Sequence, residues 1–304
     1  RGGPVPRFPV QSPRSGRSNS AAMTSTPAAG SAARRPGRLI LILALLAPLA
    51  HAATAPRFEL LFSDAFDGSS LNTKAWVTEA GDGSALRYKG WLDGEKQVYS
   101  PSNALTVGGQ LRLRATQSPA GIVSGRVRSR QSWMPSPNAG QYNVIRFEAR
   151  YRVQPGSGLR ARFFLLPVPR PGAMCVGCGL YGPWPASGEV DVLDVSNDMV
   201  DVKGGARFGG VGPNARSVGA TWHYDGAANA TGWHTIALEW EPTKMTWYMD
   251  GQPRYRLVSG KGTQAGWFTA ASRTSPNAPF DRPFYLGMAL SAGGITAGDH
   301  SLQQ

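Results

Sequence analysis

Short segments in which apolar and polar residues alternate constrain this chain most, because a period of two marks a β-strand with one buried face. The clearest spans residues 145–153, where five apolar or aromatic residues alternate with three arginines and one glutamate. Residues 111–115 and 236–240 repeat the pattern, and Asp250-Gly251 is a strong hairpin turn signal. No helix-period segment exceeds two turns. We therefore predict an all-β fold, a β-sandwich or jelly roll, in one domain.

The first 52 residues differ from the predicted β domain. Residues 1–22 contain no acidic residue, and we interpret them as a non-native leader or gene-model extension before a start at Met23. Residues 23–52 have the pattern of a secretory signal peptide: a basic segment, about eleven apolar residues and Ala50-His51-Ala52. That apolar run is shorter than the roughly twenty residues of a membrane span. We expect a secreted protein, extracellular or in a cell wall, with no stable membrane anchor and a mature domain of residues 53–304.

The positive charge of the chain is concentrated at its N-terminus. The formal net charge is +13, and residues 1–52 hold seven arginines and no acidic residue. Removing these seven from the 32 basic residues leaves 25 against 19 acidic ones, a net charge of +6. Arginines at alternate positions in residues 126–130 and 146–152 are predicted to lie on a solvated strand face. No nucleic-acid recognition motif accompanies them, so we predict no nucleic-acid partner.

Cys175 and Cys178 are the only cysteines, which excludes a scaffold built on disulfides. In an exported chain the pair either closes a small loop or remains as two free thiols. Zinc would need further ligands, and the four histidines show no suitable spacing. Asn229-Ala230-Thr231 is a glycosylation sequon, which is compatible with export.

Three carboxylates, Glu189, Asp191 and Asp194, stand within six positions of an apolar, β-branched segment. Such clustering costs free energy because each carboxylate raises the pKa of the others and all lose solvation. Glu189 and Asp191 share a strand face, whereas Asp194 joins them only if a β-bulge occurs near Val192-Leu193. Otherwise Asp194 faces solvent at a strand end.

Two kinds of chemistry use such a cluster. Retaining glycoside hydrolysis needs two carboxyl groups roughly 5–5.5 Å apart, a separation that the bulge would give Glu189 and Asp194. A calcium site is the alternative, but Ca²⁺ takes six to eight oxygen ligands, and three carboxylates on one strand supply too few.

All nine tryptophans follow residue 52, and most are predicted to lie in the core, Trp240 and Trp247 among them. Three others neighbour turn residues or histidine. For these we weigh stacking on sugar rings against plain packing: Trp91, Trp184 and Trp222.

Several motifs, in order, resemble glycoside hydrolase family 16, which includes laminarinases, lichenases and related β-glucan-binding proteins. The resemblance runs from about Phe58 to Gly294. Its motifs are the opening strand at 62–68, Glu-x-Gln-x-Tyr within 94–99, the catalytic strand at 184–194, a hairpin within 233–251 and a late strand pair at 278–286. The resemblance implies a concanavalin-like β-jelly roll. Because the chain stops at Gln304, it also implies that the last strand is missing.

By this resemblance Glu189 is the nucleophile, Asp191 holds a proton between its neighbours, and Asp194 is the acid/base where the family normally has Glu. His223 and Glu95 are implied sugar contacts, with a hydrogen-bonded structural role as the alternative for each. Residues 159–164 read Leu-Arg-Ala-Arg-Phe-Phe where the family usually has Leu-Trp-Pro-Ala-Phe-Trp.

The sequence therefore predicts a secreted retaining endo-glycosidase of β-1,3- or mixed-linkage glucan. The alternative is a β-glucan-binding protein that has lost turnover, because Asp194 is one methylene short and residues 159–164 lose two tryptophans of the family pattern and gain Arg160 and Arg162. The predicted partner is the polysaccharide, and no cofactor or metal is expected. Linkage specificity, a structural calcium ion and the oligomeric state have no readable signal in the sequence.

Overall fold

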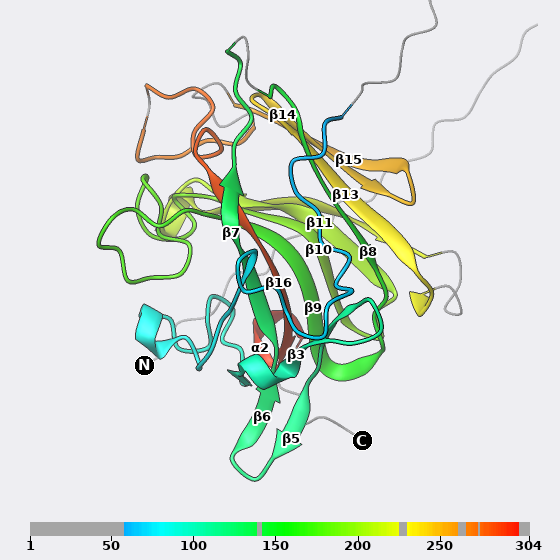
Figure 1. Ribbon diagram of the computed structural model, residues 1–304. Helices are drawn as coiled ribbons and strands as arrows, with labels where there is room; N and C mark the ends of the chain where they lie inside the picture. The colour runs from blue at the N-terminus through cyan, green and yellow to red at the C-terminus, as the bar shows by residue number, and fades with distance from the viewer. Residues whose placement is uncertain (1–57, 139–141, 225–229, 261–265, 273, 298–304) are drawn as a thin grey trace, which may run out of the picture. The chain divides into compact units, whose positions relative to one another are not determined.

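The computed structural model in Figure 1 describes residues 58–138, 142–224, 230–260, 266–272 and 274–297. The chain divides into residues 1–55 and 56–304, and every described residue lies in the second part. The predicted leader (1–22), the signal peptide (23–52) and Asn229 of the sequon lie outside the described residues.

Strands dominate the described residues. They are β1 (Trp76–Thr78), β2 (Val98–Tyr99), β3 (Ala104–Thr106), β4 (Leu111–Leu113), β5 (Thr116–Ser118), β6 (Gly121–Ser124), β7 (Arg126–Trp133), β8 (Ile145–Tyr151), β9 (Gly156–Pro167), β10 (Glu189–Asn197), β11 (Asp201–Phe208), β12 (Arg216–His223), β13 (His234–Glu241), β14 (Lys244–Met249), β15 (Gln252–Val258) and β16 (Phe284–Ala292). The short helical turns are η1 (Ser84–Leu86), η2 (Pro101–Asn103), η3 (Gly212–Asn214) and α2 (Gly294–Ala297).

Two antiparallel sheets make up most of the fold. The larger has seven strands in the order β1-β7-β16-β9-β10-β11-β12, and the smaller has four in the order β15-β14-β13-β8. Figure 1 shows β7, β16, β9 and β10 side by side, with β13, β14 and β15 forming the other sheet. Minor sheets join β2, β6 and β5, and β3 and β4.

The inner faces of the two large sheets share one hydrophobic core. Trp240 and Trp247 of the smaller sheet are fully buried in one cluster with Val190 and Val192 of β10. The Trp240 ring meets Phe284 of β16 edge-on at 5.4 Å between centroids. Removing each such side chain from water contributes roughly 1.5–3 kcal/mol. The predicted all-β sandwich is confirmed, and so are the core positions of both tryptophans.

The local strand predictions also hold. Residues 145–153, 111–115 and 236–240 contain β8, β4 and part of β13. Asp250 and Gly251 link β14 to β15 with φ angles of 49° and 76°. A two-residue type I′ hairpin turn needs φ above zero at both positions, which an Asp-Gly pair adopts at little cost.

Two strands expected from the family resemblance are not strands here. Residues 62–68 form no strand, because Asp64 turns the chain: its Oδ1 accepts the Phe66 amide at 2.8 Å, and its Oδ2 accepts Trp76 Nε1 at 2.8 Å. The late motif becomes a strand only at Phe284. The missing last strand implied by the resemblance stays a prediction.

The prediction that residues 126–130 present a solvated arginine face is wrong for Arg126, which is 2% exposed. Its strand β7 lies inside the large sheet, between β1 and β16. Arg126 Nε donates to Glu79 Oε2 at 2.5 Å, and its guanidinium lies 4.5 Å from the Trp91 ring centroid. A carboxylate and an aromatic face therefore replace the water that we expected.

Candidate active site

The predicted bulge is present in β10. Asp191 pairs with Phe164 of β9 and Leu193 pairs with Phe163, so Val192 is the extra residue. The pairing with β11 shifts between Asp191 and Asp194 in the same way. Val192 and Leu193 both pack into the core. The bulge turns Asp194 onto the face that carries Glu189 and Asp191, as the spacing of the acids predicted.

Arg160 of β9 holds Asp194 through both carboxylate oxygens. Its Nε donates to Oδ1 and its Nη2 donates to Oδ2, each at 2.7 Å. The remaining Nη1 donates to Asp93, in the segment before β2. Arg160 is 1% exposed and Asp194 is 5% exposed. This bidentate geometry is the strongest form of an arginine–carboxylate pair.

Arg162 and Arg207 cover the other two acids. Arg162 donates to Glu189 through Nη2 and to Asp191, where its Nε lies 3.1 Å from Oδ1. Arg207 of β11 donates from Nη1 to Asp191 Oδ2 at 2.6 Å. Glu189 is fully buried. Together with Asp93, four carboxylates and three guanidinium groups form one cluster, the arginine–carboxylate cluster.

The guanidinium groups lower the pKa of two of the acids, Asp93 and Asp191. Burial alone would raise the pKa of Asp93, but Arg160, Arg162 and Arg207 outweigh it and hold that pKa at about 2. Burial likewise opposes ionisation of Asp191, yet Arg162 and Arg207 hold its pKa below the ordinary value. Asp191 is therefore ionised at neutral pH, which is opposite to the proton-holding role implied by the family resemblance.

The Asp93 ion pair predicts a pH dependence of stability. A carboxylate whose pKa is depressed in the folded state stabilises it fully above its unfolded pKa and loses this contribution as the pH falls through the folded value. Between pH 5 and pH 2, the parent should lose on the order of 2 kcal/mol more free energy of unfolding than Asp93→Asn does. Urea unfolding at a series of pH values measures this. The exposed Asp67→Asn variant is the control, and parallel profiles for parent and Asp93→Asn would contradict the ion pair.

The three predicted sugar contacts differ in position. Trp184 is half-buried and joins the arginine–carboxylate cluster, since its Nε1 donates to Glu189 Oε2 at 2.6 Å. Trp91 is 3% exposed and packs edge-on against Tyr99. Trp222 is 7% exposed and lies in the core, with Nε1 donating to Met249 Sδ at 2.9 Å. Trp91 and Trp222 are therefore packed in hydrophobic clusters, the alternative weighed for them in the sequence, and Trp184 alone of the three keeps a partly exposed side chain.

Glu95 and His223 make hydrogen bonds with neighbours. Glu95 is buried, and its Oε2 accepts Gln97 Nε2 at 2.7 Å and the Tyr99 hydroxyl at 2.8 Å. His223 is exposed on the edge strand β12, with Nδ1 2.6 Å from Asp201 Oδ1. These contacts are of the structural kind weighed for both residues in the sequence.

Sequence reasoning missed two members of the cluster, Asp93 and Arg207. Asp93 lies in a segment without regular structure, and Arg207 lies on β11, so neither shares a motif with the acids. A signal for Arg160 and Arg162 was present: charged residues at alternate positions of an apolar strand need carboxylates across the sheet.

No group of three or more His, Cys, Asp or Glu side chains among the described residues is arranged to hold a metal ion. In the arginine–carboxylate cluster, guanidinium groups supply the positive charge that a cation would bring. Within the same residues, no helix has the length and apolar character needed to cross a bilayer.

Comparisons with known proteins point to β-glucan-directed hydrolases. No family model matches the chain. It is 30% identical over 251 residues to glucan endo-1,3-beta-glucosidase A1 of Niallia circulans, covering 77% of this chain but only 34% of that protein's length. It is 28% identical to a beta-glucanase of Rhodothermus marinus, covering 82% of this chain and 80% of the relative.

Two further comparisons bear on fold and function. The solved laminarinase from Rhodothermus marinus superposes with a TM-score of 0.63 at 26% identity, covering 82% of this chain and 91% of that chain. A beta-1,3-glucan-binding protein of Penaeus monodon is 27% identical over 194 residues, covering 57% of this chain and 47% of the relative. The similarity thus includes both glucan-cleaving and glucan-binding proteins.

Proposed function

The chain belongs to glycoside hydrolase family 16 and is similar to its endo-β-1,3-glucanases, and from that premise we propose that it recognises β-1,3- or mixed-linkage glucan without hydrolysing it. The observation that carries this proposal is the bidentate ion pair between Arg160 and Asp194. The proposal includes export, with the protein acting outside the cell or in the cell wall, on the strength of the signal-peptide pattern in residues 23–52.

The Arg160–Asp194 pair opposes acid catalysis. A retaining glycosidase needs a carboxyl group that gives a proton to the glycosidic oxygen and later takes one from water. Both oxygens of Asp194 instead accept N–H groups of Arg160, and the side chain is 5% exposed. Asp194 is therefore not placed to donate to a leaving group.

Glu189 is equally poorly placed for nucleophilic attack. Attack requires its carboxylate within about 3–3.5 Å of the anomeric carbon. One oxygen accepts from Arg162, the other accepts Trp184 Nε1, and the side chain is fully buried. A sugar ring would have to displace a buried guanidinium and break an ion pair before reaction, at a cost of several kcal/mol.

Binding and turnover can be measured on the same protein. Calorimetry with a soluble β-1,3-glucan should detect binding, and reducing-end release from the same glucan should stay at the level of Glu189→Gln. A Trp184→Ala variant tests whether the half-buried indole contributes to binding. Release that exceeds the Glu189→Gln background would refute the proposal.

Retaining hydrolysis is the second candidate, favoured by the bulge at Val192. That bulge gathers Glu189, Asp191 and Asp194 on one face, the arrangement that double displacement uses. Release abolished by Glu189→Gln would select this candidate and would mean that Arg160 and Arg162 move aside when glucan binds.

A further inference from the structure

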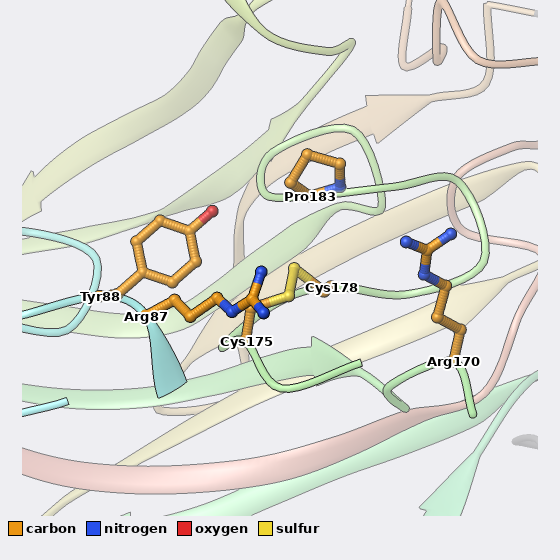
Figure 2. A pocket seen from close by; sticks show the side chains of 6 residues that line it. All are labelled: Arg87, Tyr88, Arg170, Cys175, Cys178 and Pro183. Atoms are coloured by element: carbon orange, nitrogen blue, oxygen red, sulfur yellow. A yellow bond between two sulfur atoms is a disulfide. The ribbon is translucent and has the colours of Figure 1, made fainter. Parts of the chain in front are cut away.

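A pocket of about 340 Å³ opens near the arginine–carboxylate cluster, between two irregular segments. Figure 2 shows it with the disulfide at its centre and Arg87 and Arg170 reaching in from different sides. The lining residues are Arg87, Tyr88, Arg170, Cys175, Cys178 and Pro183.

The pocket adjoins the cluster through both of its walls. One wall belongs to the segment that also carries Asp93, the partner of Arg160. The other wall lies between β9 and β10 and includes Pro183, the neighbour of Trp184, whose indole donates to Glu189. The Cys175–Cys178 loop, which lines the pocket, also lies against the Trp184 indole, so the pocket is next to that side chain.

The walls of the pocket are held in place. Cys175 and Cys178 form a disulfide, which selects the closed-loop alternative left open by the sequence. Val176 and Tyr88 pack in a second hydrophobic cluster with Trp91. A Cβ on Gly177 would come within 3.1 Å of Trp184 Cδ1, so this loop lies directly against the indole. A preformed pocket loses little entropy when it binds a ligand.

The charge of the pocket is positive and not neutralised. No lining residue is acidic. Arg87 and Arg170 are exposed, and among the described residues neither forms an ion pair or a side-chain hydrogen bond. The buried arginines differ, since Arg160 and Arg162 both hold carboxylates. Two unpaired guanidinium groups in a concave surface attract an anion and can grip it through paired N–H groups.

We propose that this pocket binds an anionic group, a sulfate ester or a carboxylate, carried by a β-linked glycan whose backbone lies beside Trp184. The placement of the backbone rests on the proposed glucan recognition. The Arg87 and Arg170 guanidiniums hold the anion, and the half-buried Tyr88 ring supplies an apolar edge for the sugar that bears it. The preferred ligand is thus an acidic glycan rather than neutral glucan.

The test is calorimetry of the full chain, with its disulfide intact, against three β-1,3-glucan oligosaccharides of equal length: neutral, O-sulfated, and oxidised to carboxylates. At 0.15 M salt, one or both anionic forms should bind about tenfold more tightly than the neutral form, and comparing the two identifies the anion. In Arg87→Gln/Arg170→Gln that preference should disappear while affinity for the neutral form is unchanged. Arg254→Gln/Arg256→Gln, at two exposed positions of β15, removes the same number of charges and is the matched control.

The outcomes separate the two proposals. Equal affinity for all three oligosaccharides, or a preference that survives in Arg87→Gln/Arg170→Gln, would overturn the anion pocket and leave glucan recognition standing. A preference reduced equally by Arg254→Gln/Arg256→Gln would be general charge attraction and would overturn the anion pocket as well. Arginine-dependent binding of anionic forms with no binding of the neutral form would support the pocket and overturn recognition of neutral glucan.

Discussion

Replacing Arg162 with methionine should lower the free energy of unfolding at neutral pH by about 3–5 kcal/mol. Arg162 is buried, at 5% exposed, and it contacts both Glu189 and Asp191, which are 0% and 6% exposed. Removing one member of a buried ion pair leaves the other charge without compensation, and methionine fills much of the volume without supplying a donor. Urea unfolding followed by circular dichroism measures the change, with Arg256→Met as a surface control expected within about 0.5 kcal/mol of the parent.

The same reasoning predicts a rescue. Neutralising the acids as well, in Arg162→Met/Glu189→Gln/Asp191→Asn, should recover part of the lost stability, because the two carboxylates that lose Arg162 are no longer charged. The recovery is partial because Arg207, whose side chain is 18% exposed, then loses both carboxylate partners. If Arg162→Met alone leaves stability within about 0.5 kcal/mol of the parent, the guanidinium does not hold these carboxylates as described. If the triple variant is less stable than Arg162→Met, the loss comes from packing rather than charge.

Glucan hydrolysis should appear when Arg160 and Arg162 are replaced and Asp194 is lengthened to glutamate. In Arg160→Trp/Arg162→Ala/Asp194→Glu, reducing-end release from soluble β-1,3-glucan should rise at least about 10²-fold above the parent. Tryptophan and alanine are the residues of the family pattern at these positions. Together they remove the Arg160 donors to Asp194 and the Arg162 donors to Glu189 and Asp191, while Arg207 still donates to Asp191. The glutamate adds the methylene that brings its carboxyl group toward the leaving group.

Two control variants assign the cause. Adding Glu189→Gln to the triple variant should return release to background, because the nucleophile is gone. Asp194→Glu alone should remain silent, because Arg160 still donates to the longer carboxylate. Activity in Asp194→Glu alone would mean that the short acid is the only defect and that the arginines are no obstacle.

The strand positions and the bulge could be predicted from the sequence, because both depend on the alternation of successive side chains between the two faces of a strand. Alternation along a strand decides which side chains share a face, and three acids at 189, 191 and 194 can share one only with an inserted residue. Val192 proved to be that residue. The arginine partners did not follow, since the pairing of Arg160 with Asp194 depends on how β9 and β10 are aligned.

The errors have the same physical origin. Trp222 and His223 are neighbours on one strand and therefore point to opposite faces, but the sequence does not say which face is buried. The structure places Trp222 in the core and leaves His223 exposed. Arg126 has the same alternating pattern as the half-buried Arg128 and the exposed Arg130. It is buried because Trp91, Tyr99 and Glu79 cover its guanidinium. Segments distant in sequence, which pack against the strand, decide such cases.

One hydrogen bond joins the two large sheets of the sandwich at the bulge. Trp247 of the smaller sheet donates its indole N–H to the backbone carbonyl of Asp191 at 2.8 Å, across 56 positions of sequence. A bulge interrupts the ladder and leaves a backbone group that needs a partner from elsewhere. Trp247, which makes no hydrogen bond to the carboxyl groups, thus holds the backbone of β10 at the start of the bulge. A substitution at Trp247 could alter the spacing of the acids, and the effect of any change at Asp194 would then depend on which residue occupies position 247.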